Sequence, residues 1–318
     1  MSAPLVDVLI LGAGPAGLAT ANGLARQLHT AIVFNSSNFR NSNAKHMHNV
    51  PGWDHRPPGE FRQKARSDIL ARYSTIQFKD VEVVLVRKLD TGYFEAVDAD
   101  NGVYVGKKVV VATGVRDIML DVPGYKELWG TGIFHCLFCH GYEERGHESA
   151  GVLAMGLMAN PVHTPAISRM ASRLAYKVNV YTNGNPEFGA ELRELLKSTK
   201  NFNIENRKIV ELKKNPAIPG DAGVLVTLED GTVNREGFVA HAPETVQASP
   251  FAEQLGLELA PQGHIQTVAP FNSTNVPGVF AAGDGATFVK AVPSAIMMGG
   301  MAAVGIAHTL QAEEDVED

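Results

Sequence analysis

The two cysteines of the chain, Cys136 and Cys139, are separated by two residues and flanked by His135 and His140. A Cys-X-X-Cys pair in a chain without other cysteines is typical of thiol–disulfide exchange or of metal binding. A structural zinc ion needs four ligands in a tetrahedral arrangement, which four neighbours on one tight turn cannot easily provide. We therefore favour redox chemistry and predict no metal site. Zinc binding and two buried structural cysteines are the less favoured interpretations.

His140 and His135 are the candidate acid–base residues beside the cysteine pair. A free cysteine thiol has a pKa of about 8.5 and needs a base to react well at neutral pH. The imidazole of histidine, with an ordinary pKa of about 6.5, can accept that proton without staying charged. We predict a catalytic role for His140 and a second, weaker candidacy for His135. Packing or capping is the alternative role of each histidine.

A glycine-rich segment near the start of the chain predicts a dinucleotide site. It follows an apolar run at 6–11 and precedes a helical pattern. The first glycine permits the tight turn, the second lets a pyrophosphate approach the backbone, and the third lets the helix pack on the strand. The helix N-terminus attracts phosphate through its free N–H groups. The predicted cofactor-binding residues of this segment are Gly12, Gly14, Pro15, Ala16 and Gly17.

Residues at the ends of other predicted strands indicate which dinucleotide is bound. Thr113 and Gly114 end a buried strand, and Gly283 with Asp284 ends another, close to the final helix. An aspartate in that place can bind a sugar-like chain of hydroxyl groups. Dinucleotide sites normally carry an acidic residue about 20 residues after the glycines. Here the residue is Asn35, which accepts a hydrogen bond without charge, so the NAD interpretation is weakened and FAD remains compatible.

The order of patterns along the chain predicts an α/β fold with two nucleotide-binding domains, the second inserted into the first. Each domain shows strand, helix, strand and then further β-structure. The antiparallel excursion of the first domain is expected over 77–102, with a hairpin at 100–102. The last helix is expected at 293–311, followed by a disordered acidic tail. We place the FAD-binding domain at 1–117 and 247–318, and the inserted domain at 118–246.

The expected elements of the inserted domain are strands at 151–155 and 177–181, and helices over 163–175 and 187–198. Composition is that of an ordinary globular protein, with 45% hydrophobic and 19% charged residues. The net charge of −6 and the lack of a basic run argue against nucleic-acid binding. The sequence suggests neither a signal peptide nor a membrane span of about 20 apolar residues, so we expect a cytoplasmic protein.

Over essentially its whole length the chain resembles the low-molecular-weight thioredoxin reductases. The shared motifs are the segment at 12–17, Asn49-Val50-Pro51-Gly52, Ala112-Thr113-Gly114, the CxxC, the run at 277–284 and Met301-Ala302-Ala303. The resemblance implies two Rossmann-like domains of three layers (ββα/βαβ), FAD, a homodimer and a flavin ring beside the cysteines. It also implies that Asn49 and the backbone near Ala291 and Val292 approach the flavin. The family has Arg-Gln where this chain has Lys290-Ala291.

The inserted domain departs from that family at the NADPH site. Of its glycine motif, which would hold the cofactor's pyrophosphate, only Gly156 remains, and Met158 would place a side chain where phosphate needs bare backbone. The family's His-Arg-Arg cluster for the 2′-phosphate is replaced by Thr182-Asn183-Gly184, without a basic residue. We therefore expect electrons to enter from a dithiol rather than from NADPH, with unusual NADPH binding as the alternative.

A second departure lies beside the cysteines, where His140 replaces the family's aspartate. The segment at 135–143, with the histidines near 46–55, resembles the fungal dithiol oxidases that close disulfides in epidithiodiketopiperazines. This resemblance implies a small-molecule dithiol substrate, dioxygen as acceptor and hydrogen peroxide as product. By the same analogy Cys136 meets the substrate and Cys139 faces the flavin. The alternatives are an NADPH-dependent thioredoxin reductase and a non-catalytic flavin redox sensor.

Overall fold

The computed structural model describes residues 4–197, 201–220 and 222–317. The chain divides into two compact units. Unit 1 is made of two segments, which end at Arg116 and resume at Thr245, and unit 2 is the continuous stretch between them. These divisions lie close to the boundaries expected from the sequence.

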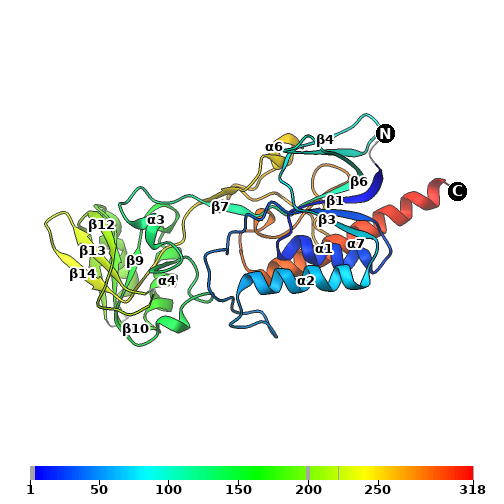
Figure 1. Ribbon diagram of the computed structural model, residues 1–318. Helices are drawn as coiled ribbons and strands as arrows, with labels where there is room; N and C mark the ends of the chain where they lie inside the picture. Colours follow the sequence, from blue (N-terminus) through cyan, green and yellow to red (C-terminus); the bar gives the residue numbers. More distant parts are fainter. Residues whose placement is uncertain (1–3, 198–200, 221, 318) are drawn as a thin grey trace. The chain divides into compact units, whose positions relative to one another are not determined.

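Unit 1 is built on a seven-stranded sheet with the order β3-β2-β1-β6-β5-β4 and with β17 beside β6. Strand β1 pairs in parallel with β2 on one side and with β6 on the other, and the apolar runs of these strands are buried because helices cover the sheet. Figure 1 shows α1, α2 and α7 together on one side of these strands. The elements before the insertion are β1 (Leu5–Leu11), α1 (Pro15–Ala25), β2 (Ala31–Phe34), α2 (Pro58–Arg72), β3 (Ile76–Lys79), β4 (Val83–Lys88), β5 (Phe94–Asp98), β6 (Val103–Val111) and β7 (Val115–Asp117).

After the insertion, unit 1 is completed by strands and helices from the end of the chain. They are β16 (Thr245–Gln247), α6 (Phe251–Gln254), β17 (Val279–Ala281), the short 3₁₀-helix at Asp284–Ala286 and α7 (Val292–Glu317). Two expectations need correction. The helix α2 was not predicted, and the expected antiparallel excursion begins one strand later, because β3 pairs in parallel with β2. The hairpin between β5 and β6 is confirmed.

The helices α1 and α7 pack closely along each other (Figure 1). A Cβ at Gly299 would overlap the carbonyl oxygen of Ala16, so the backbones meet through a glycine. The buried hydroxyl of Thr20 donates to the carbonyl of Ala16 at 3.0 Å and lies 3.1 Å from that of Gly299. This contact fixes the start of α1, which is the end that faces the predicted pyrophosphate.

Helix α7 runs further than the sequence indicated. We expected a disordered tail after residue 311, but the helix continues to Glu317. No glycine or proline interrupts 306–317, and the amine of Lys108 pairs with Glu313. Among the described residues, Val292–Glu314 is also long and apolar enough to cross a membrane by length and composition alone. Our expectation that no segment would be long and apolar enough to cross a membrane is therefore wrong. Half of that apolar window is buried in the structure, as in a core helix.

Unit 2 carries a parallel five-stranded sheet of order β11-β10-β9-β15-β8 and an antiparallel sheet β12-β13-β14 (Figure 1). Its core lies between the parallel sheet and the helices α4 and α5. Its elements are α3 (Tyr125–Leu128), β8 (Ile133–Phe134), the 3₁₀-helix at Tyr142–Glu144, β9 (His147–Leu153), the 3₁₀-helix at Gly156–Met158, α4 (His163–Ala171), β10 (Ala175–Tyr181), α5 (Pro186–Leu196), β11 (Phe202–Glu205), β12 (Ile209–Lys214), β13 (Val224–Leu228), β14 (Val233–Glu236) and β15 (Phe238–Ala240).

A buried histidine ties α3 to the end of β15 in unit 2. The Nδ1 atom of His241 is 2.6 Å from the hydroxyl of Tyr125, and its Nε2 atom is 3.3 Å from the carbonyl of Met155. Because a carbonyl can only accept, Nε2 carries the proton and the tyrosine donates to Nδ1. Burial lowers the pKa of His241 to about 4. The ring is therefore neutral in the fold at neutral pH.

His241 should make the protein lose stability in mild acid. The unfolded chain takes up a proton near the ordinary pKa of about 6.5, whereas the folded ring stays neutral down to about 4. Stability from this residue is thus complete above that ordinary value and falls by about 2 to 3 kcal/mol between pH 7 and pH 4.5. The free energy of unfolding, measured by urea titration, should fall less steeply in His241→Gln than in the native protein or in His163→Gln. Equal slopes in all three would contradict the assignment.

Candidate active site

The cysteine pair follows β8 at the carboxyl edge of the parallel sheet of unit 2. Cys136 and Cys139 form a disulfide with an S–S distance of 2.07 Å. They lie on a single helical turn, in which the amides of Cys139 and His140 donate to the carbonyl of Cys136 at 3.2 and 3.0 Å. The amide of Cys139 also lies 3.0 Å from Sγ of Cys136. An N–H aimed at that sulfur stabilises negative charge on it once the disulfide opens.

The imidazole of His140 is held from two sides. Its ring stacks on the buried ring of Phe134, with centroids 4.0 Å apart and an interplanar angle of 22°. Its Nε2 atom lies 3.3 Å from Oε1 of Glu144. The second oxygen of Glu144 lies 3.2 Å from Nε2 of His147. The structure therefore places a fixed imidazole next to Cys139 in the chain, backed by a buried carboxylate.

Sequence reasoning missed Phe134, Glu144 and His147. The spacing of four residues between His140 and Glu144 was a usable signal, because such pairs lie on one side of a helical turn. His135, the other predicted acid–base residue, contacts the ring of Trp129 with centroids 5.8 Å apart. The catalytic roles of Cys136, Cys139, His140 and His135 remain predictions.

The glycine segment of unit 1 has the shape that a pyrophosphate requires. A Cβ at Gly17 would overlap the carbonyl oxygen of Gly12, so the third glycine is needed for packing. Gly12 itself has a φ of +114°, which favours glycine, and lies against the carbonyl of Ala112. A Cβ at Gly14, by contrast, would meet no atom within 4 Å. The open space therefore lies over Gly14, at the N-terminus of α1, with Pro15 and Ala16 in its first turn.

The other strand ends of unit 1 converge on the same place. A Cβ at Gly283 would lie 3.0 Å from the Cβ of Ala16, and one at Gly285 would lie 3.2 Å from the carbonyl oxygen of Gly114. The hydroxyl of Thr113 is 2.8 Å from that of Ser249. Asp284 pairs with Arg40, with 3.2 Å between Nη1 and Oδ2. The residues predicted at the ends of β6 and β17 are thus brought together with the start of α1.

Beside this turn, unit 1 contains a cavity of about 200 Å³. Asn35 faces it and donates through Nδ2 to Asp80 at 2.7 Å. Arg66 binds both oxygens of Asp80, and these hydrogen bonds lower the pKa of that carboxyl to about 2. The lining is aromatic and basic, which suits the adenosine end of a dinucleotide, and consists of Ala13, Leu18, Asn35, Phe39, Arg62, Gln63, Arg66 and Phe78.

The residues expected near the flavin ring lie on two other segments. Asn49, with a φ of +61°, lies on the loop between β2 and α2, and its amide donates to Asp54 at 2.9 Å. Ala291 and Val292 form the start of α7, where the amide of Ala295 donates to the carbonyl of Ala291. We call the open space over Gly14, in the turn between β1 and α1, the glycine cradle. This cradle and the adjoining cavity fit FAD. The individual contacts of these residues to the flavin remain predictions.

The degenerate nucleotide loop of unit 2 is closed by its own residues. The side-chain oxygen of Asn160 accepts hydrogen bonds from the amides of Val162 and His163, at 2.8 and 3.2 Å. The amide of Thr164 donates to the carbonyl of Asn160 at 3.0 Å. These are the N–H groups that the start of α4 would offer to a phosphate. Asn160 therefore occupies the donors that a pyrophosphate would need.

Met158 does not act as the sequence suggested. We expected its side chain to fill the phosphate position, but it is buried among the apolar residues of unit 2. An apolar side chain next to a core gains free energy by turning inward. The hydroxyl of Thr164 bonds to its carbonyl oxygen and holds the turn. The obstruction comes from Asn160, a residue that the sequence did not single out.

At the end of β10, the side chain of Lys208 lies against Gly184, whereas the other basic residue nearby is held by acidic partners. The hydroxyl of Thr182 donates to Asn206 at 2.8 Å. The nearby Arg207 pairs with Glu205 and, at 2.6 Å, with Asp230. A guanidinium held by two carboxylates is poorly placed to bind a phosphate dianion.

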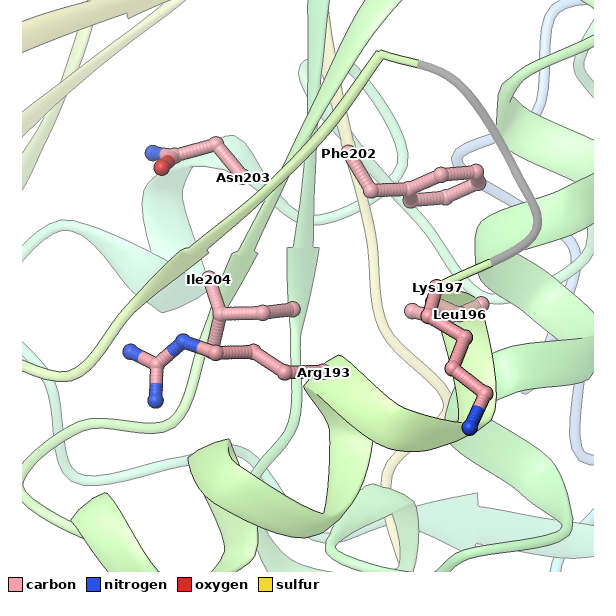
Figure 2. Close-up of a pocket in the computed structure, with 6 residues that line it drawn as sticks. All are labelled: Arg193, Leu196, Lys197, Phe202, Asn203 and Ile204. Atoms are coloured by element: carbon pink, nitrogen blue, oxygen red, sulfur yellow. The ribbon is translucent and has the colours of Figure 1, made fainter.

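Unit 2 also contains a cavity, of about 360 Å³, which is shown in Figure 2. It lies between α5 and β11, and its lining residues are Arg193, Leu196, Lys197, Phe202, Asn203 and Ile204. Because β11 begins here, the cavity is at the amino edge of the parallel sheet. The cysteine pair follows the carboxyl edge of the same sheet, so this cavity is separate from the candidate active site.

The fold and the disulfide agree with one family of redox enzymes. The family model for pyridine nucleotide-disulphide oxidoreductases matches residues 6–299, and the chain belongs to that family. A thioredoxin reductase from Streptococcus pyogenes has the same fold, with a TM-score of 0.81, 22% identity and coverage of 98% of this chain and 100% of the other. The predicted two-domain α/β architecture of thioredoxin reductases is thereby confirmed.

Two fungal relatives are more similar in sequence. The thioredoxin reductase aclD of Aspergillus oryzae is 45% identical over 316 residues, covering 99% of each chain. The thioredoxin reductase tcpT of Claviceps purpurea is 42% identical, covering 94% of this chain and 92% of the relative. Proteins of this type bind FAD, so the chain is an FAD-dependent oxidoreductase, as the resemblance to thioredoxin reductases implied.

Proposed function

We propose that the protein is an FAD-dependent dithiol oxidase, which closes a disulfide in a small-molecule dithiol and passes the electrons to dioxygen. The observation that carries this proposal is the closed loop before α4, where Asn160 satisfies the amides of Val162 and His163. With these amides already bonded, NADPH loses a binding feature at this helix, and a thiol substrate is the electron donor that the cysteine pair can use. The cysteine pair is the group in this chain that can accept them.

Thiol–disulfide exchange supplies the first half of the reaction. One substrate thiolate attacks Sγ of Cys136, and Cys139 leaves as a thiolate. The second substrate thiolate then attacks the substrate sulfur bound to Cys136, which releases a substrate disulfide and the reduced cysteine pair. His140 accepts a thiol proton in this sequence. Bound over Gly14, FAD would supply the two-electron acceptor for the reduced pair and the route to dioxygen, with hydrogen peroxide as the product.

The substrate class and the partners are part of the same proposal. An epidithiodiketopiperazine dithiol presents two thiols in one small molecule, as the exchange on a single cysteine pair requires. We propose a cytoplasmic homodimer that works on this substrate with dioxygen, without nucleic acid or membrane. These statements rest on the resemblance to dithiol oxidases and on the composition.

The test measures peroxide formed by the purified holoenzyme with a small dithiol in air, with and without NADPH. We expect turnover with the dithiol alone and no acceleration by NADPH. In an anaerobic cuvette, the dithiol should bleach the flavin absorbance and NADPH should not. A matched experiment uses Asn160→Gly, which frees the two α4 amides, beside Asn203→Gly as a control at the opposite edge of the sheet.

The competing function is an NADPH-dependent thioredoxin reductase, which the names of the fungal relatives favour. Rapid bleaching by NADPH, with no dithiol-driven peroxide, would establish that function and remove ours. A flavin that responds to dithiol without any turnover would instead indicate a redox sensor.

A further inference from the structure

Glu144 is a buried carboxylate that is shared by two histidines. Its side chain is 8% exposed, and it ends the short 3₁₀-helix between the cysteine turn and β9. One oxygen lies 3.3 Å from Nε2 of His140, and the other lies 3.2 Å from Nε2 of His147. A buried carboxylate is costly unless both oxygens are bonded, so this arrangement needs both imidazoles.

His147 holds the second oxygen of Glu144 in place. It is the first residue of β9, and its ring packs against the backbone at Gly237. A Cβ at Gly237 would overlap that ring, so glycine makes the room that the ring needs. With one oxygen bonded to His147, the other oxygen of the carboxylate is directed at His140.

An ionised carboxylate only accepts hydrogen bonds, so each Nε2 atom that faces Glu144 must carry a proton. In neutral His140 this leaves Nδ1 unprotonated. The stack on Phe134 fixes the plane of the same ring. We infer that Glu144 is a positioning residue of the cysteine centre, which holds His140 as the Nε2–H tautomer so that Nδ1 is the atom that accepts a thiol proton.

The inference rests on the proposed function for its chemistry. When a substrate thiol is deprotonated, its proton moves to Nδ1 of His140 and the imidazolium that forms is balanced by Glu144. No electron moves in this step, and the thiolate that is left attacks the disulfide. Without the carboxylate, the imidazole can adopt the other tautomer, in which Nδ1 carries a proton and is no longer a base.

The charged neighbours of Glu144 in the chain differ from it in exposure. Glu143, Arg145 and Glu148 are exposed. The guanidinium of Arg145 lies 3.9 Å from the ring centroid of Tyr142. Glu148, on the same strand as His147, therefore provides a matched control for removing a carboxylate at this place.

The first experiment needs no substrate. Nitrogen-15 NMR of histidine-labelled holoenzyme should show His140 with its proton on Nε2 in the native protein and in Glu148→Gln. In Glu144→Gln, the His140 resonances should show a mixture of tautomers, because the amide oxygen of glutamine can satisfy only one of the two imidazoles. A native protein with the proton on Nδ1 of His140 would overturn the inference, whatever reaction the enzyme catalyses.

The second experiment measures reactivity. After reduction, the rate at which iodoacetamide alkylates the cysteines should have its pH midpoint at higher pH in Glu144→Gln than in the native protein or Glu148→Gln. Dithiol turnover should lose about 10- to 100-fold in kcat with little change in KM, because the base acts in the chemical step. If Glu144→Gln does not fold, His147→Asn tests the same arrangement, because it removes the imidazole that bonds to the second oxygen of Glu144. Unchanged alkylation profiles and kcat in the folded variant would overturn the role.

Discussion

Replacing Cys136 or Cys139 by serine is expected to lower dithiol-dependent peroxide formation by at least about a thousandfold, because neither variant has a disulfide to accept electrons. Each single variant keeps one thiol, which has no partner cysteine with which to form the disulfide that exchanges with the substrate. The measurement is peroxide release in air with a small dithiol. Turnover above one-tenth of the native rate in either variant would show that electrons reach the flavin by another route.

The cysteine variants also have an internal control. Because the glycine cradle lies in unit 1 and the cysteines lie in unit 2, both variants should bind FAD and show the native visible spectrum. Loss of the yellow colour together with loss of activity would point to misfolding. A variant that keeps its flavin but stays oxidised under anaerobic dithiol identifies the cysteine pair as the entry point.

Replacing Gly14 by valine is expected to give a folded protein that no longer holds FAD. Gly14 has an ordinary φ of −74°, and a Cβ there would meet no protein atom within 4 Å. The added side chain would instead fill the space where the pyrophosphate approaches the start of α1. We expect affinity for FAD to fall by at least about a hundredfold, read from the flavin content of the purified protein and from FAD titration.

The matched comparison for this variant is Gly17→Ala. A Cβ at Gly17 would overlap the carbonyl oxygen of Gly12, so this smaller change should disturb the fold itself and lower the thermal midpoint. Gly14→Val should keep a thermal midpoint close to that of the native protein stripped of FAD. A Gly14→Val protein with normal flavin content would mean that the cofactor does not lie over this turn.

The features that the sequence predicted are those written in local patterns. Gly12, Gly14 and Gly17 have fixed spacing after an apolar strand, and the structure brings them to one turn. The cysteine pair is equally local. Helix α2 was missed because its buried residues are few, Pro58 and Ile69, so it has almost no apolar stripe to recognise.

Other features depend on residues that meet only after folding. The bonding of Glu144 to two histidines needs the backbone at Gly237 to lie against His147. No spacing rule in the sequence connects those positions. We predicted that the phosphate position before α4 is blocked, but we assigned the block to Met158 instead of Asn160. The direction of the Met158 side chain depends on the neighbouring core, which the local sequence does not show. The helical tail also carries a pair between Lys108 and Glu313, which are far apart in the chain.

The interrupted course of unit 1 sets the order in which the protein can be completed during synthesis. Strand β17 inserts beside β6 at Val109–Val111, and α7 packs on α1, yet both come from the last part of the chain. Unit 2 is continuous and is synthesised entirely before these elements are made. The flavin site of unit 1 is therefore complete only after α7 has been made, so the newborn chain can bind its cofactor only after unit 2 has been synthesised.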